Sequence, residues 1–301
     1  MKKYLSNNTI LAIISCLLWS SAFVGVKIGL KHHTPLQFAG VRFFIAGIIL
    51  LPIVGNWALF KKEVSENFTF VCVVAFLQVV LQYTFFYQGV NLVPASISAM
   101  IVGSSPLFVA LVAHFTIPND RLSISKILSI LLGILGVAVI TLGRKSLPSG
   151  AEIGLWGVVW LILNNVTSGV TNVVIARKKK PISPMILTSS SLIIGGLAMA
   201  LISIPFEGLP GHSFPAEYFF ALGWLSFLSA AAVSIWNTLL RKPVIKVSEL
   251  NVWKFLIPVS GAVLSWLILP NESPDLISIG GMVLIGLSLV TLNFSHQKAN
   301  G

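Results

Sequence analysis

Charged residues are scarce in this sequence of 301 residues, because Asp, Glu, Lys and Arg together make up only 10% of it. A soluble domain carries about 25% charged residues, since its surface faces water. Hydrophobic residues make up 55% of the chain, and the mean hydropathy is +0.91. The shortage of charge excludes an ordinary water-soluble domain and predicts an integral membrane protein.

Acidic residues are the rarest charged class, and all nine fall in loops or at the ends of the apolar segments. A carrier coupled to protons or sodium usually keeps a carboxylate within the membrane. Its absence from the spans predicts facilitated export or exchange, or coupling through another group. The same absence argues against an intramembrane aspartyl protease.

Cysteine is nearly absent, and Cys16 and Cys72 both lie within apolar segments. Two such cysteines form neither a disulfide framework nor a metal site, and His114 has no other metal-binding residue in its segment. We therefore expect no metal and no cofactor. The net charge of +11 is spread over short loops, so no nucleic acid is expected. The run Arg177–Lys180 is interpreted as a topology anchor, with contact to anionic lipid heads as the further possibility.

What the chain does have is a series of apolar segments, each close to the roughly 20 residues that a spanning helix needs. The segments predict ten spans, at residues 9–30, 35–55, 68–89, 95–116, 124–143, 152–176, 183–205, 216–240, 248–269 and 275–294. With the N-terminus inside, 14 of the 20 Lys and Arg residues lie on the inner side and 3 on the outer side. This asymmetry predicts a multi-pass protein of the cytoplasmic membrane with both termini in the cytoplasm.

The same pattern occurs twice along the chain. Pro106 is followed twelve residues later by Pro118, and Pro258 is followed twelve residues later by Pro270, each opening an acidic turn. The offset between the copies is half the chain, which predicts two five-helix repeats, at residues 1–150 and 151–301. Five spans are an odd number, so the second repeat enters the bilayer inverted, as in carriers that work by alternating access. Pro106 and Pro258 are either simple helix kinks or gating points.

Several short motifs support a family assignment. They are Trp19-Ser20-Ser21-Ala22-Phe23, Arg42-Phe43-Phe44, the segment from Tyr87 to Pro94-Ala95-Ser96, and the two proline segments that end at Asp120 and Glu272. Together with length and duplication, they resemble the EamA-type transporters of the drug/metabolite transporter superfamily. The resemblance implies an all-α fold of ten helices in two inverted repeats around a central cavity, with helices five and ten outside it. Asn164 and Asn165 depart from the aromatic and small pair expected in the second half.

The candidate cavity residues are cationic, amide-bearing or aromatic, with the hydroxyl of Ser20 as an addition. Arg42 is expected to meet helix carbonyls, waters or an anionic ligand. Lys254 is expected to extend to the cytoplasmic surface, with a cavity role as the alternative. Gln78 and Gln82, four residues apart, predict one polar helix face. The full set of candidates is Trp19, Ser20, Phe23, Arg42, Gln78, Gln82, Tyr83, Tyr87, Asn165, Trp236 and Lys254.

The sequence therefore predicts a secondary transporter, an exporter of small metabolites such as amino acids or related compounds. The first alternative is an exchanger of organic anions or phosphate esters, for which Arg42 and Lys254 would hold the anion. A channel and an intramembrane enzyme acting on lipid are remoter alternatives, and no constellation of acid, base and nucleophile supports the enzyme. The expected partners are a small-molecule substrate and the bilayer, for a monomer or a homodimer.

Overall fold

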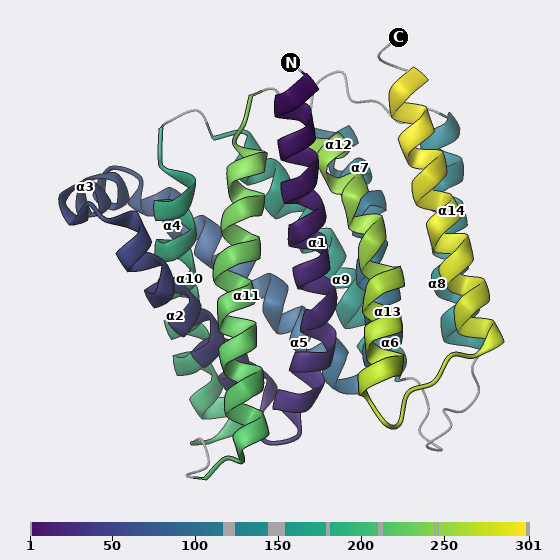
Figure 1. The fold of residues 1–301 in the computed structure, drawn as a ribbon, viewed down its shortest axis with the longest axis horizontal. Helices are drawn as coiled ribbons and strands as arrows, with labels where there is room; N and C mark the ends of the chain where they lie inside the picture. Colours follow the sequence, from purple (N-terminus) through teal and green to yellow (C-terminus); the bar gives the residue numbers. More distant parts are fainter. Residues whose placement is uncertain are drawn as a thin grey trace.

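The computed structural model of this chain is all-helical over the residues it describes, which are 2–116, 124–143, 154–178, 181–209, 213–243, 245 and 247–298 (Figure 1). The predicted acidic turn at Asn119-Asp120 lies outside them. Seven described helices are long and apolar enough to cross a membrane, and three shorter apolar helices cover Ile127–Gly143, Trp253–Ile268 and Leu276–Thr291. The predicted all-α membrane fold is confirmed, while the number of ten spans stays a prediction.

The helices follow the predicted apolar segments closely. The first half contains α1 (Lys2–Leu30), α2 (Pro35–Val54), α3 (Trp57–Glu66), α4 (Phe68–Val74), the π-helix η1 (Ala75–Leu81), α5 (Gln82–Leu92), α6 (Ala95–Gly103), α7 (Ser105–Thr116) and α8 (Ile124–Gly143). The second half contains α9 (Leu155–Ala176), α10 (Pro184–Glu207), α11 (Ala216–Leu240), α12 (Val247–Val252), the 3-10 helix η2 (Trp253–Phe255), α13 (Leu256–Ile268) and α14 (Leu276–Lys298). Proline opens α2 and α10, where its fixed φ suits a helix start and its missing N–H costs nothing.

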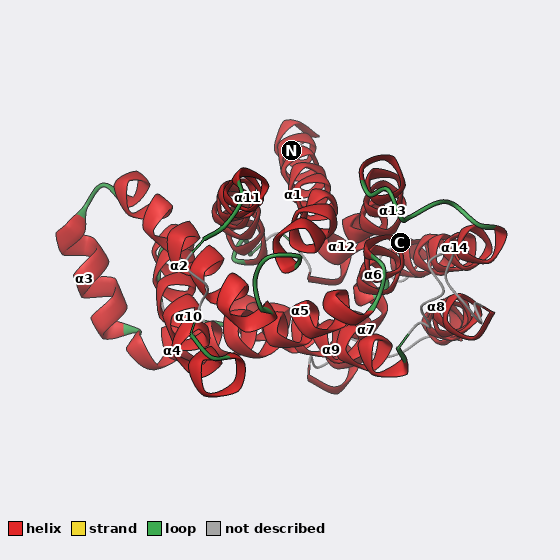
Figure 2. Ribbon diagram, turned by 90° about the horizontal axis from the view of Figure 1, so that it is seen from below, coloured by secondary structure: helices red, strands yellow, loops and turns green. Residues whose placement is uncertain are grey.

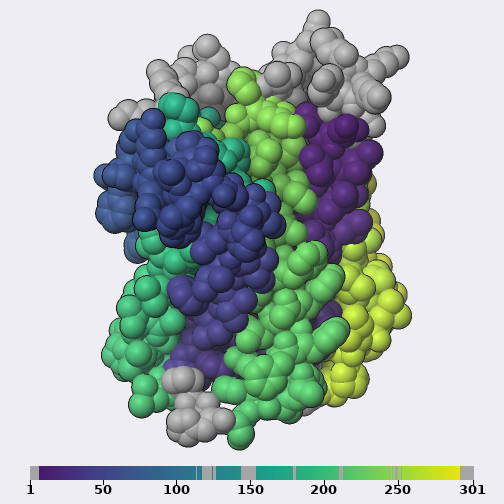
Figure 3. All heavy atoms as spheres, turned by 60° about the vertical axis from the view of Figure 1, so that its left-hand side comes forward, coloured from purple at the N-terminus to yellow at the C-terminus, as the bar shows by residue number. Residues whose placement is uncertain are grey.

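Helix α3 was not predicted, because its residues were expected to form a loop. Asn56 caps it by accepting a hydrogen bond from the backbone N–H of Leu59 at 2.9 Å. None of its residues is buried, and Trp57 stacks on Phe60 with ring centroids 5.1 Å apart. Helix α3 lies on the outside of the bundle, at the end of the molecule that carries the N-terminus (Figures 1 and 3). Aromatic and basic residues on one exposed helix are typical of the membrane interface.

Three of the predicted spans are interrupted rather than continuous. The segment 68–92 contains η1, and the segment 95–116 breaks at Ser104 between α6 and α7. In the second half, η2 separates α12 from α13. Pro106 lies in the first turn of α7 and Pro258 in the first turn of α13. A first turn tolerates proline, so each proline begins a new helix just after a break.

The helices form two rows, seen from below in Figure 2, with α11, α1 and α13 in one row and α5, α9 and α7 in the other. Within the rows, α1 packs on α11 and α13, whereas α9 packs on α5 and α7. Helix α2 packs along α10 at one end, and α8 pairs with α14 at the other (Figure 2). A Cβ atom added to Gly196 would lie 2.4 Å from the backbone nitrogen of Phe44, so α2 and α10 approach backbone to backbone.

Three carboxylates join the two halves of the chain at helix ends. Glu207 accepts hydrogen bonds from the backbone N–H groups of Leu36 at 2.9 Å and Gln37 at 3.0 Å, at the start of α2. Glu272 does the same for Ala95 at 2.6 Å and Ser96 at 2.8 Å, at the start of α6. In the opposite sense, Glu63 of the first half accepts from Ser183 at 2.7 Å, just before α10. A negative charge is stabilised at a helix N-terminus by the free N–H groups and by the helix dipole.

Candidate functional site

A pocket with a cavity volume of about 80 Å³ lies between the two rows of helices. Both halves of the chain contribute to its walls. Its lining residues are Trp19, Ala22, Phe23, Arg42, Gln78, Gln82, Tyr83, Phe86, Val102, Ser105, Asn164, Asn165, Ser168, Thr171, Asn172, Val233, Trp236, Lys254 and Ile257. Aromatic rings, amides and two cations therefore share one enclosed space.

The structure brings together all of the predicted cavity residues except two. Ser20 faces α13, where its hydroxyl lies 2.7 Å from that of Ser260. Tyr87 is fully buried behind Arg42 and does not line the pocket. Pro106 and Pro258 do not line it either, but each follows a lining residue, Ser105 and Ile257 respectively. Nine of the eleven predicted cavity residues therefore line one pocket, and their role in binding a substrate stays a prediction.

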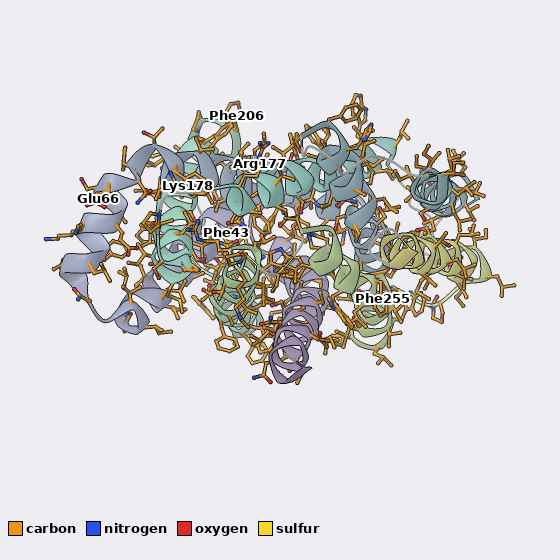
Figure 4. The ribbon with its side chains drawn as sticks, turned by 90° about the horizontal axis from the view of Figure 1, so that it is seen from above. Phe43, Glu66, Arg177, Lys178, Phe206 and Phe255 are labelled. Carbon is orange, nitrogen blue, oxygen red and sulfur yellow. The ribbon has the colours of Figure 1, made fainter. Side chains whose placement is uncertain are left out.

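Arg42 is held in place by uncharged groups. Its side chain is 1% exposed. Its Nε donates to Ser229 Oγ at 2.9 Å and to the Leu225 carbonyl at 3.3 Å, and Nη1 donates to the Tyr87 hydroxyl at 2.7 Å. The guanidinium carbon lies 4.7 Å from the ring centroid of Phe43, which points into the bundle (Figure 4). These partners orient the guanidinium but leave its charge uncompensated, because no carboxylate contacts it in the described part of the chain.

Lys254 does not extend to the membrane surface, so the prediction that it would is wrong. It lies in η2, is 5% exposed and lines the pocket. Its Nζ is 3.4 Å from Ser168 Oγ, 5.0 Å from the ring centroid of Trp236 and 5.7 Å from that of Trp19. The break between α12 and α13 turns the lysine inward, and the aromatic faces stabilise its charge.

The inner face of α9 carries a polar stripe that the sequence analysis largely missed. Asn165 donates to the Ile101 carbonyl at 2.7 Å, beside the break between α6 and α7. Asn172 accepts from Trp236 Nε1 at 2.9 Å and donates to Asn251 at 3.3 Å. The stripe comprises Asn164, Asn165, Ser168, Thr171 and Asn172. Its helical spacing was a usable signal, because polar residues recurred on one face of an otherwise apolar segment.

Gln78 lies in the π-helix η1 and lines the pocket together with Gln82 and Tyr83. Its side-chain amide faces that of Asn237, with Nε2 3.3 Å from Asn237 Oδ1. Single turns of π-helix are rare and occur often at functional sites, because they re-aim the side chains that follow. The wider turn here presents the amide of Gln78 from one row to α11 in the other.

The chemistry of the pocket favours an anion. Two buried cations line it, one from each half, and no carboxylate lies among its described lining residues. A buried charge is costly unless it is paired, so a ligand that carries a carboxylate or a phosphate would complete the site. No group of three or more His, Cys, Asp or Glu residues that could hold a metal occurs in the described ranges.

Comparison with known proteins agrees with this architecture. The model of the EamA-like transporter family matches residues 8–142 and 155–294. An "Uncharacterized transporter YoaV" of Bacillus subtilis (strain 168) is 24% identical, over 96% of this chain and 98% of its own length. A "Probable amino-acid metabolite efflux pump" of Escherichia coli (strain K12) is also 24% identical, over 96% of this chain and 96% of its own.

The fold itself is known from experiment. One solved crystal structure superposes with a TM-score of 0.68 at 16% identity, over 98% of this chain and 99% of that chain. At that identity the likeness concerns the fold alone. The family model covers both halves, and the relatives match over nearly their whole length. This multi-pass membrane protein therefore belongs to the EamA-like transporter family, within the drug/metabolite transporter superfamily.

Proposed function

We propose that this protein is a secondary carrier that exports a small carboxylate-bearing metabolite, an amino acid or a related compound, across the cytoplasmic membrane. The observation that carries the proposal is the pair Arg42 and Lys254. Both are buried, both line one pocket, and neither contacts a carboxylate in the described ranges. A ligand carboxylate supplies the missing negative charge in a low-dielectric site.

The pocket also limits what else the substrate carries. An ammonium group would need an acidic partner or a free aromatic face, and the faces of Trp19 and Trp236 already lie near Lys254. A derivative with a masked amine, and so a net negative charge, fits better than the zwitterion. The printed name of the Escherichia coli relative, an efflux pump for an amino-acid metabolite, supports the direction and the class.

The arrangement of the helices supports alternating access. In the two predicted repeats, α1 occupies the same position as α9. Likewise η1 and α5 correspond to α11, and α7 corresponds to α13. The packing of α1 on α11 and α13 then matches the packing of α9 on α5 and α7. Helix breaks before Pro106 and Pro258 occur at corresponding positions of the halves. Two such matched halves can exchange local shapes and open the pocket to either side in turn.

The start of α1 and the end of α14 lie at the same end of the molecule (Figure 1). The excess of Lys and Arg on that side supports cytoplasmic termini. The proposal therefore includes a carrier oriented with Lys2 and α3 towards the cytoplasm and the loop after Leu30 towards the outside.

A matched set of ligands tests the proposal on detergent-purified protein. Leucine, N-acetyl-leucine and leucinamide share one side chain and differ in which charged groups they keep: both, the carboxylate alone, or the ammonium alone. Ligands that bind the folded state raise the melting temperature. We expect stabilisation in the order N-acetyl-leucine, leucine, leucinamide, and efflux of the best ligand from proteoliposomes. Equal stabilisation by leucinamide would overturn the requirement for a carboxylate.

A charge variant tests the site. Lys254→Gln keeps a polar, hydrogen-bonding side chain, slightly shorter than lysine, but removes the cation, and about tenfold weaker binding of the anionic ligand is expected. Lys242→Gln is the matched control, because Lys242 bonds to Asn8 at 2.7 Å and does not line the pocket. If both variants weaken binding alike, the pocket lysine is not a ligand for the anion.

The second candidate is an exchanger of phosphate esters, which the presence of two cations favours because a phosphate ester carries two negative charges. Stabilisation by a sugar phosphate and none by N-acetyl-leucine would select it. Counterflow of phosphate against that ester in proteoliposomes would then be the transport assay.

A further inference from the structure

A second, separate groove lies where α4, α7 and α9 come together at one end of the bundle. It has a volume of about 400 Å³, and its walls are apolar: Phe70 from α4, Val112 from α7 and Val173 from α9 are among them. Arg177 and Lys178, which follow α9, complete its lining. The groove therefore offers an apolar surface that suits an acyl chain and, at one end, two cations that suit an anionic headgroup.

The two cations are fixed at the mouth of the groove. Arg177 Nη1 donates to the Thr116 carbonyl at 2.7 Å, at the end of α7. Lys178 Nζ lies 4.4 Å from the ring centroid of Phe70. Arg177 is exposed, and a guanidinium has five N–H donors, so one bond to a carbonyl leaves most of its donors available. In Figure 4 both cations lie on the row of helices opposite that of Phe255.

The depth of the groove follows from the ends of the spans. The span of α9 ends at Ala176, the segment of α7 ends at Thr116, and the segment of α4 begins at Phe68. The cations therefore lie at the level of lipid headgroups, and the valine wall extends from there towards the hydrocarbon region. The groove is separate from the transport pocket, because the latter uses Ser168 and Asn172 on a different face of α9.

We propose that this groove is a binding site for an anionic phospholipid. The lipid phosphate pairs with Arg177 and Lys178, and one acyl chain lies along the wall formed by Phe70, Val112 and Val173. Charge complementarity selects an anionic lipid over a zwitterionic one. The apolar wall selects a phospholipid over a soluble phosphate, which gains nothing from valine side chains. The inference does not depend on the transported substrate.

Native mass spectrometry of the full chain in detergent tests the site. The probes are dioleoyl phosphatidylglycerol and dioleoyl phosphatidylcholine, which share their acyl chains and differ in net charge. Wild-type protein is expected to retain phosphatidylglycerol about tenfold better. Equal retention of the two lipids would overturn the proposal.

A pair of double variants separates a built site from diffuse surface charge. Arg177→Gln with Lys178→Gln should reduce retention of phosphatidylglycerol about tenfold. Lys61→Gln with Lys62→Gln is the matched control, since it removes two charges from α3, which ends shortly before α4 begins. The control is expected to stay within about twofold of wild type. An equal loss in both double variants would show only nonspecific attraction to the surface.

The apolar half of the site has its own test. Val174→Trp fills the groove without changing charge, because Val174 is a partly exposed lining residue, and it should also weaken retention of phosphatidylglycerol. Glycerol phosphate, which has the headgroup phosphate but no acyl chain, should not displace the lipid; displacement would overturn the phospholipid assignment. Lys178→Gln alone replaces the double Gln variant if the latter melts early, since it removes one cation and leaves the bond of Arg177 to the Thr116 carbonyl intact.

Discussion

Arg42 and Tyr87, which lie 45 residues apart in sequence, form a hydrogen bond of 2.7 Å from the guanidinium Nη1 to the phenol hydroxyl. Tyr87 is completely buried. The bond therefore fixes one edge of a cation whose Nε donates to Ser229 and Leu225 on α11. It joins α2 to α5 at the wall of the pocket.

Replacing the phenol should uncouple stability from ligand binding. Tyr87→Phe leaves a buried donor of Arg42 unsatisfied, so we expect the free energy of unfolding to fall by about 1–3 kcal/mol. The charge remains, so an anionic ligand should still raise the melting temperature. Arg42→Gln should abolish that rise. Thermal unfolding with and without N-acetyl-leucine measures both effects, and loss of the ligand effect in the phenylalanine variant would contradict this division of roles.

The carboxylate caps should contribute measurable stability. Glu272→Ala removes the acceptor for the N–H groups of Ala95 and Ser96, and a lost cap costs about 0.5–2 kcal/mol. Glu66→Ala is the control, because Glu66 is exposed at the end of α3. Melting temperatures of the two variants in the same detergent decide the matter. An unchanged melting temperature for Glu272→Ala would mean that water caps α6 equally well.

The crossing of α2 and α10 should not tolerate a methyl group. Gly196→Ala places a Cβ atom 2.4 Å from the backbone nitrogen of Phe44, and overpacking of this kind costs about 1–3 kcal/mol. Gly223→Ala is the control within α11, because a Cβ atom there meets nothing within 4 Å. That control should be neutral or stabilise by up to about 1 kcal/mol. Equal melting of both variants would show that the crossing can open without cost.

Stability should fall on the acid side because of His33, which lies in the loop between α1 and α2. Its ring stacks on Phe214 at 5.2 Å and on Tyr218 at 5.7 Å. Burial lowers the pKa of His33, opposed by its hydrogen bond with the Thr34 carbonyl and by the charge of Glu207. The unfolded chain then binds a proton more readily than the folded chain. Stability is therefore complete above the ordinary histidine pKa of about 6.5 and is lost as pH falls through the lower folded value.

The His33 effect is checked by melting the protein from pH 8 to pH 5. His33→Phe keeps the stacked ring and removes the titrating group, so its curve should be flatter than that of wild type. Parallel curves for the two proteins would assign the acid sensitivity to another group.

Helix positions were predicted well wherever proline or charged residues marked both ends of an apolar segment. The helix expected at 216–240 is found as Ala216–Leu240, because Pro215 precedes it and Arg241 follows it. The interruptions were not predictable from hydropathy. The π-helix from Ala75 to Leu81 and the break at Ser104 preserve an apolar composition and change only the backbone register.

The least predictable feature was whether a polar side chain points into the pocket or towards the membrane surface. Lys254 lies a few residues from the end of its apolar segment, a position that favours extension to the surface. Only the turn of η2 directs it inward. By contrast, the stripe from Asn164 to Asn172 on α9 was predictable, because its polar residues recur at helical spacing within an apolar segment.

Glu207 and Glu272, which cap the N-termini of α2 and α6 in the other half of the chain, have a consequence for how the protein is assembled. The amide of Leu36 is capped by a carboxylate 171 residues further along the chain, and that of Ser96 by one 176 residues further. A ribosome therefore releases α2 and α6 into the membrane long before their partners exist. The N-termini of α2 and α6 therefore lack their capping carboxylates until the second half of the chain has been synthesised. Assembly of this protein is thus an event that follows synthesis, and a chain truncated at its midpoint lacks the carboxylates that close its own helices.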